Sequence, residues 1–200
     1  MNTANPEPRP SPVAAGSASP CEDGGAVDGA RGRLWGRLGF PVRFLLLSFV
    51  FQGLAAGPLE PVLLPTLARA VAVQSGAILT VTGETVRTQG PVVSAPERSW
   101  AFRIVADCTP LVPGLLYGAA VLAFPAGLRA RLLGLAAGAG FLWLANLGRI
   151  VALYGVHSSR PELYDRLHET VGQGFVVAAA AAAFVVFTLS VRRSVERSDA

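Results

Sequence analysis

Two long apolar segments limit what this chain can fold into more than any other feature. Residues 132–156 contain one charged side chain, Arg149, and residues 171–191 contain none. Segments of about 20 apolar residues are long enough to cross the ~30 Å hydrocarbon core of a bilayer. Charged residues make up 15% of the chain, well below the roughly 25% of a soluble domain. The sequence therefore predicts a membrane protein.

Two shorter apolar segments complete the predicted set of spans. In one of them, fourteen uncharged and mostly apolar residues follow Arg43, and the other, residues 111–124, is apolar and free of charge. We expect an all-α polytopic membrane protein with about four transmembrane helices. Its membrane domain covers residues 34–191. The predicted spans are residues 40–57, 110–125, 132–156 and 171–191.

The arginines indicate how these spans are oriented. They cluster before or at the start of the first span, between the second and third, and after the fourth: Arg31, Arg33, Arg37, Arg43, Arg129, Arg131, Arg192, Arg193 and Arg197. Cytoplasmic loops carry an excess of basic residues, so both tails and the 125–131 turn are expected in the cytoplasm. Residues 58–109 and 157–170 then face outward. The net charge of +4 thus reflects membrane topology and does not indicate nucleic-acid binding.

The two ends of the chain are predicted to be tails. Residues 1–33 are rich in Pro, Ala, Gly and Ser, which is typical of a disordered cytoplasmic segment. The first apolar run begins too late for a cleavable signal peptide. Residues 192–200 form a basic cytoplasmic tail. Cys21 is expected to be incidental, and the two cysteines of the chain indicate neither a disulfide framework nor a metal cluster.

The outward segment 58–109 is predicted to begin with a helix and to continue as a small β-rich flap. Residues 58–75 are apolar but interrupted by prolines, which favours an amphipathic helix on the membrane surface over a short re-entrant helix. Residues 77–88 alternate β-branched and polar side chains, and residues 100–105 repeat the extended pattern. We expect a hairpin or a three-stranded sheet outside the bilayer.

Three polar groups from separate segments fall at one predicted depth, near the outer surface. Cys108 lies at the outer mouth of the second span, and His168 precedes the fourth. Arg149 lies roughly 25 Å along the third span, at about 1.5 Å per residue. A guanidinium inside an apolar span costs about 3 kcal/mol or more unless it faces protein or water, so a functional Arg149 is favoured over a topology-fixing one. Asn146, one helical turn earlier, is placed to support it.

The residue types suit nucleophilic catalysis. A free cysteine is most often a small buried hydrophobe, which is the alternative interpretation of Cys108. At the start of a helix and beside a cation, however, the thiolate is favoured by the helix dipole and by the charge. Cys108 is then the candidate nucleophile, Arg149 stabilises negative charge, and His168 is the acid/base. His157 is the rival histidine, ranked lower because no matching pattern surrounds it.

This combination resembles the exosortase and archaeosortase family. The residues that carry the resemblance are Cys108, Asn146, Arg149, Ile150, His168 and Gly172. The resemblance covers about residues 40–190, and the short chain is most similar to a compact branch such as exosortase H. One difference is that Thr109 and Pro110 follow the cysteine, where the family often has a small or polar residue and then Gly.

The resemblance implies a cysteine protease or transpeptidase of the bacterial inner membrane, with a site that faces the periplasm. Cys108 would be the nucleophile, Arg149 the essential arginine and His168 the acid/base. Its clients would be exported proteins with a C-terminal sorting tail, made of a short motif, a transmembrane helix and a basic end. No metal or organic cofactor is implied. Two alternatives are a non-catalytic membrane scaffold, in which Arg149 pairs with an acidic residue of a partner helix, and a small transporter.

Overall fold

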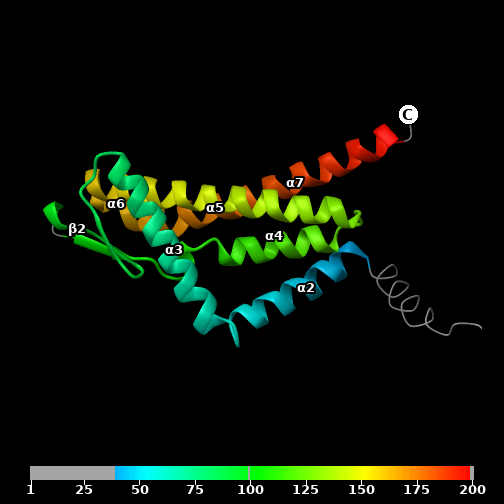
Figure 1. Ribbon diagram of the computed structural model, residues 1–200, viewed down its shortest axis with the longest axis horizontal. Helices are drawn as coiled ribbons and strands as arrows, with labels where there is room; N and C mark the ends of the chain where they lie inside the picture. Colours follow the sequence, from blue (N-terminus) through cyan, green and yellow to red (C-terminus); the bar gives the residue numbers. More distant parts are fainter. Residues whose placement is uncertain (1–38, 99, 199–200) are drawn as a thin grey trace, which may run out of the picture. The chain divides into compact units, whose positions relative to one another are not determined.

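The computed structural model describes residues 39–98 and 100–198, so the predicted tail 1–33, with Cys21, lies outside the described residues. The described chain is mostly helical and carries one three-stranded sheet (Figure 1), which confirms the predicted fold class. The helices are α2 (Phe40–Ala55), α3 (Glu60–Val81), α4 (Leu111–Ala123), α5 (Leu128–Ser159), α6 (Pro161–Arg166) and α7 (Gln173–Ser198). A π-helical turn, Leu167–Gly172, joins α6 to α7.

In the described part of the chain, three helices are long and apolar enough to cross a membrane: α3, α5, and α7 as far as Ser194. The predicted spans 132–156 and 171–191 correspond to α5 and α7. The predicted spans 40–57 and 110–125 correspond to α2 and α4, which are apolar but have only 16 and 13 residues. At about 1.5 Å per residue, α4 extends roughly 20 Å, less than the ~30 Å of a bilayer core.

The segment after α2 differs from the prediction. A single helix, α3, runs through the boundary expected at residue 75 and through the first part of the strand expected over 77–88. Its buried positions recur every three or four residues: Ala68, Val71, Ala72, Ser75, Gly76 and Leu79. The helical period therefore continues into the β-branched stretch, because this face packs against α5 and the sheet. Pro61 lies in the first turn of α3, where a missing N–H removes no helical hydrogen bond.

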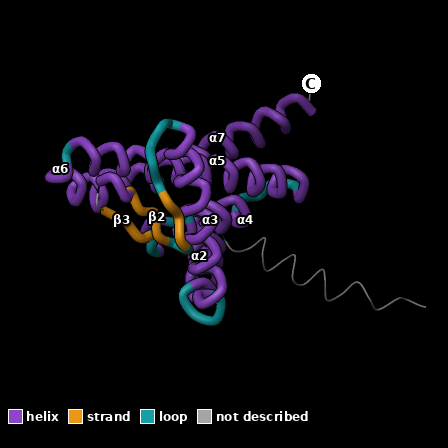
Figure 2. The backbone as a smooth tube through the Cα atoms, turned by 60° about the vertical axis from the view of Figure 1, so that its left-hand side comes forward, coloured by secondary structure: helices purple, strands orange, loops and turns teal. Residues whose placement is uncertain are grey.

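The sheet consists of β1 (Arg87–Gln89), β2 (Val92–Ala95) and β3 (Trp100–Arg103), antiparallel in that order. Of the two predicted forms, a hairpin or a three-stranded sheet, the structure has the second, although β1 begins at Arg87 and not at residue 77 as expected. Gly90 has a φ of 59° in the tight turn between β1 and β2, a conformation that favours glycine. The sheet packs against α3, as Figure 2 shows.

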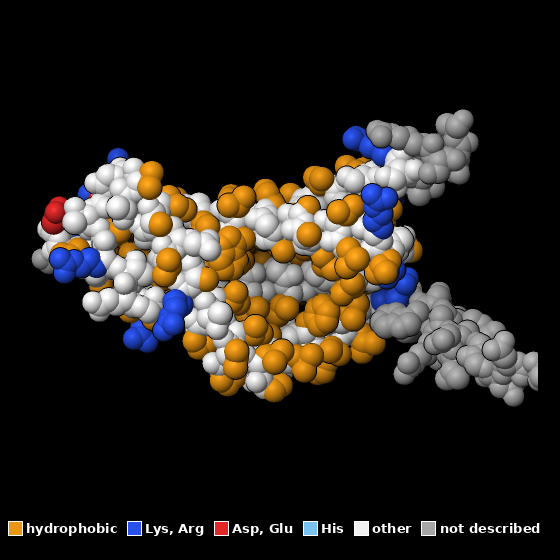
Figure 3. Space-filling view, viewed as in Figure 1, with side chains coloured by type: hydrophobic (Ala, Val, Ile, Leu, Met, Phe, Trp, Pro, Cys, Tyr) orange, Lys and Arg blue, Asp and Glu red, His pale blue; other side chains and the backbone are white. Residues whose placement is uncertain are grey.

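Buried side chains form two clusters along α5. One joins α3, the sheet and α5, and it contains Cys108 together with Leu79, Val93, Leu147 and Ile150. The other joins α4, α5 and α7, and it contains Tyr117. Figure 1 shows the sheet and α6 at one end of α5 and the α4–α5 connection at the other. Figure 3 shows hydrophobic side chains between two ends at which basic side chains gather.

Candidate active site

Cys108 is positioned by a 3₁₀ turn, Ala106–Cys108, between β3 and α4. Its side chain is buried, with 6% exposed, in the cluster between the sheet and α5. Because α4 begins at Leu111 with Pro110 as its N-cap, the thiol precedes the helix instead of opening it. The thiol therefore lies just before the first turn of α4, as the predicted span 110–125 implies, and outside the turn in which a helix dipole acts most strongly.

His168 lies against the thiol. Its Nε2 is 3.6 Å from Sγ of Cys108, within hydrogen-bonding range for sulfur, although the two residues are 60 positions apart. His168 belongs to the π-helical turn before α7, and such turns occur frequently at functional sites. When the ring proton is on Nδ1, Nε2 is an acceptor for the thiol proton. The pair can therefore exchange a proton.

Two side chains of α5 hold the backbone on either side of the thiol. Asn146 Nδ2 donates to the carbonyl of Cys108 at 2.9 Å, and Arg149 Nη1 donates to the carbonyl of Asp107 at 2.8 Å. Their spacing of three residues puts both on one face of α5. Both are buried, with 1% and 6% exposed. These bonds fix the turn that carries the thiol.

Arg149 keeps further donors beside the site. Its Nε and Nη2 are buried, and no described residue accepts a hydrogen bond from either. A buried donor without a partner costs about 1–3 kcal/mol, more when it is charged, and is often explained by a functional role. Gly172 makes room for this guanidinium, because a Cβ there would lie 2.7 Å from Nε and 3.3 Å from Nη2. The arrangement presents cationic N–H groups beside the π turn.

Cys108 and His168 line a small cavity with about 10 Å³ of free space. Its other walls are aromatic and aliphatic: Trp100, Phe102, Ile150, Leu153, Tyr154 and Tyr164. A space of this size holds roughly one water molecule. A much larger apolar cavity of about 890 Å³ lies between α4, α5 and α7, and none of the predicted site residues lines it. The thiol of Cys108 and the imidazole of His168 thus line the smaller cavity and not the larger one.

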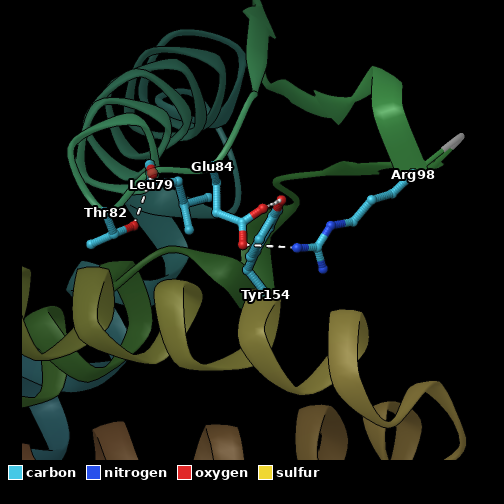
Figure 4. A network of polar contacts seen from close by, with 5 residues as sticks. All are labelled: Leu79, Thr82, Glu84, Arg98 and Tyr154. Atoms are coloured by element: carbon cyan, nitrogen blue, oxygen red, sulfur yellow. Dashed lines mark hydrogen bonds and ion pairs between the residues drawn. The ribbon is translucent and has the colours of Figure 1, made fainter.

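The carboxylate of Glu84 connects α5 to the flap, the segment between α3 and α4 that contains the sheet, near this cavity. Glu84 Oε2 accepts a hydrogen bond from Tyr154 Oη at 2.8 Å, and Glu84 Oε1 pairs with Arg98 Nη2 at 2.9 Å (Figure 4). The Arg98 guanidinium also lies 6.0 Å from the centre of the Tyr154 ring. Sequence analysis did not identify these residues, because the bonded partners are 14 and 70 positions apart. An acid directly after an apolar helix is the only local signal.

His157, the rival histidine, has a different environment from His168. Its ring packs 4.2 Å from Trp100 and 4.8 Å from Tyr164, between ring centroids. Its Nδ1 is buried and has no hydrogen-bond partner in the described part of the chain. His157 is therefore held by aromatic contacts, whereas His168 contacts the thiol. Among the side chains that the structure describes, no group of three or more His, Cys, Asp or Glu residues could hold a metal ion.

Comparison with known proteins identifies a family. Searches among curated proteins and among solved structures find no match. The sequence does match the transmembrane exosortase family (Exosortase_EpsH), over residues 17–186 of 200. This range includes Cys108, Arg149 and His168, and it extends from before α2 into α7. Because the match covers most of the chain, the protein belongs to the transmembrane exosortase family, as its motifs predict.

Proposed function

We propose that this protein is a membrane-embedded cysteine peptidase or transpeptidase that cleaves the C-terminal sorting tails of exported proteins. The carrying observation is the 3.6 Å contact between Cys108 Sγ and His168 Nε2. Arg149, whose Nε and Nη2 have no acceptor among the described residues, donates from Nη1 to the carbonyl of Asp107, the residue before Cys108. A thiol, a base within hydrogen-bonding reach and free cationic donors are the parts that acyl transfer needs. Membership of the exosortase family supports the same reaction.

The first half of the reaction forms a thioester. His168 Nε2 takes the thiol proton, and the thiolate of Cys108 attacks the carbonyl carbon of the scissile peptide bond. The electron pair of the C=O bond moves onto oxygen, where Arg149 stabilises the negative charge. The oxyanion then collapses, the C–N bond breaks, and the imidazolium gives its proton to the departing amine. The amine leaves with the transmembrane helix of the client.

The second half resolves the thioester. A water molecule or an amine acceptor attacks the thioester carbonyl, and His168 takes its proton. Collapse of this second oxyanion breaks the C–S bond and restores Cys108. Water gives a carboxylic acid, and an amine gives a new amide bond. The enzyme is therefore a protease with the first acceptor and a transpeptidase with the second.

The flap is the proposed entry point for the client. The cavity beside the thiol holds only about one water molecule. A peptide carbonyl therefore reaches Cys108 only when the surrounding wall shifts. β3 is at the edge of the sheet in the order β1-β2-β3, and it carries Trp100 and Phe102 into that wall. An extended client segment can pair with such an edge through its backbone.

We place the site on the periplasmic side of the bacterial inner membrane, in a multi-pass domain of residues 34–191. Arg129 and Arg131 lie in the first turn of α5, which follows the α4–α5 connection, whereas Arg149 lies in the second half of the helix. Basic loops stay in the cytoplasm, which supports this orientation. The proposed partners are the bilayer lipids and the tail-bearing clients.

The proposed function is tested by coexpressing the protein with a client that carries a motif, a transmembrane helix and a basic end. Cys108→Ala is expected to abolish cleavage, and Arg149→Ala and His168→Ala to slow it about 100-fold or more. Cys21→Ala is the control and should cleave normally. A Cys108-linked client released by hydroxylamine would demonstrate the thioester. If Cys108→Ala and Arg149→Ala both leave cleavage intact, the protein is not the enzyme and the scaffold hypothesis gains.

The scaffold hypothesis requires Arg149 to reach an acidic residue on a partner helix. Only 6% of Arg149 is exposed, and its Nη1 is bonded to Asp107 within the chain. Gly172 packs against the same guanidinium. The buried position therefore favours the catalytic role.

A further inference from the structure

We propose that Tyr164 is a positioning residue for His168, and that a row of aromatic rings connects it to the flap. The row consists of Trp100 on β3, His157 on α5, Tyr164 on α6 and His168 on the π turn. This inference rests on the proposed function, in which His168 transfers protons. It assigns to Tyr164 and His157 a role that neither the motifs nor the family match identifies.

The ring stack on His168 restrains the orientation of the imidazole plane, which the single hydrogen bond to Cys108 does not. The Cys108 contact fixes one atom of the imidazole, Nε2, and leaves the ring free to turn, because rotation about the Cβ–Cγ bond is soft. Tyr164 lies four residues earlier, on the same helical face. Its ring stacks on His168 with centroids 5.5 Å apart and planes 25° apart. Such a stack fixes the plane of the imidazole, and with it the direction of Nε2 toward Sγ.

Tyr164 is itself held from its other side. The ring of His157 meets it in a T-shaped contact at 4.8 Å and 81°. His157 in turn lies 4.2 Å from Trp100, between ring centroids. Nδ1 of His157 is buried without a hydrogen-bond partner among the described residues. The contacts with Trp100 and Tyr164 therefore hold the His157 ring in place. The imidazole therefore acts as a spacer in the row.

The far end of the row belongs to the flap. Trp100 packs 5.2 Å from Tyr154 and 5.6 Å from Phe102, between ring centroids. It therefore has a fixed position when β3 is in place. A shift of β3 on client binding would move Trp100, and the row passes this shift to His168. The position of the flap is thus linked to the orientation of the His168 ring through these ring contacts.

The test separates the ring of Tyr164 from its hydroxyl. Tyr164→Phe keeps the stacking face and is expected to restore the rate that Tyr164→Leu loses. In Tyr164→Leu, kcat for cleavage of a tail-bearing client should fall roughly two- to ten-fold, the equivalent of one aromatic pair, with KM nearly unchanged. His157→Phe should resemble the wild type, and His157→Leu should lower kcat in the same direction. Leu163→Ala, an exposed neighbour on α6, is the control with no expected effect.

A second readout does not depend on catalysis. The chain has two histidines, so His157→Phe leaves a single imidazole signal in the NMR spectrum of detergent-purified protein. In this background the His168 ring protons should show an upfield shift from the stacked ring, kept with Tyr164→Phe and lost with Tyr164→Leu. Loss of the shift together with lower kcat supports the proposal. Should Tyr164→Leu fail to fold, His157→Leu tests the same row.

Three results would overturn the proposal. The first is an unchanged kcat, or an unchanged chemical shift of the His168 ring protons, in Tyr164→Leu. The second is an equal loss of kcat in Tyr164→Phe and Tyr164→Leu. The third is loss of activity in His157→Phe. The second would assign the effect to the hydroxyl, and the third would make His157 a participant in the chemistry. Failure of the proposed function looks different. In that case Cys108→Ala still cleaves, while the NMR shift continues to report the stack.

Discussion

At the scale of single residues, the site depends on two side chains that hold the backbone around the thiol. Asn146 and Arg149 donate to consecutive carbonyls, those of Cys108 and Asp107. The position of the thiol therefore depends on the hydrogen-bonded backbone of its turn as well as on the side chains that surround it. In the proposed mechanism, the remaining Arg149 donors bind a reacting oxygen, and the absence of a side chain at Gly172 leaves space for the guanidinium.

Gly172→Ala is expected to displace Arg149 and to lower client cleavage. The added Cβ would lie 2.7 Å from Arg149 Nε, closer than packing allows, and in a tight contact of 3.1 Å with the carbonyl of Leu167. A small misplacement of a catalytic donor costs about 10- to 100-fold in rate, which a cleavage time course measures. Gly174→Ala is the control, because nothing lies within 4 Å of a Cβ there. Equal rates for the two variants would show that Arg149 does not depend on Gly172.

At the scale of elements, the flap is attached to α5 by a partly exposed network. The Arg98 and Glu84 side chains are 41% and 30% exposed, so solvent screens their ion pair and limits it to about 0–1 kcal/mol. The Tyr154 hydroxyl is part-buried and donates to the same carboxylate. The hydrogen bond is therefore expected to hold the flap more firmly than the ion pair does.

Glu84→Ala should loosen the flap more than Glu84→Gln. The glutamine keeps an oxygen for the Tyr154 hydroxyl and loses only the charge, whereas alanine leaves that hydroxyl unpaired at a cost of about 1–3 kcal/mol. Hydrogen exchange of the β2 and β3 amides measures the difference. Glu97→Ala, exposed in the same flap, should leave exchange unchanged. Faster exchange in Glu84→Gln than in Glu84→Ala would contradict this ranking.

The contact between α4 and α5 depends on a small residue. Gly138 faces the Tyr117 ring so closely that an added Cβ would overlap it. Gly138→Val is therefore expected to destabilise the protein by about 1–3 kcal/mol, measured as a lower Tm in detergent. Gly140→Val, exposed on the same helix with nothing within 4 Å, is the matched control. The same Tm for both variants would show that this contact contributes nothing.

At the scale of the whole molecule, the two ends of α5 are proposed to lie on opposite sides of the membrane. With Cys21→Ala and Cys108→Ala as background, Glu97→Cys in the flap should react with a membrane-impermeant maleimide in intact cells whose outer membrane is permeable. Pro125→Cys in the α4–α5 connection should react only after the inner membrane is opened, because the neighbouring arginines keep it in the cytoplasm. The reverse labelling pattern would place the site in the cytoplasm.

The sequence by itself determined the class of the protein and its family, and it predicted the types of residue at the candidate site. Charge-free segments reveal membrane helices because each residue contributes its own transfer free energy. Arg149 and Asn146 stand out because polar groups in such a segment are costly, whatever their neighbours. These are local properties, and a linear pattern carries them.

Only the tertiary structure decided how far α3 extends and what each polar group contacts. The β-branched residues after Gly76 suit a strand or a helix, and the packing of Leu79 against α5 and the sheet selects the helix. The acceptor of Arg149 is a backbone carbonyl, which any residue type supplies. The contact between Cys108 and His168 joins residues 60 positions apart. Such pairings depend on how the chain folds back on itself, which local residue preferences do not specify.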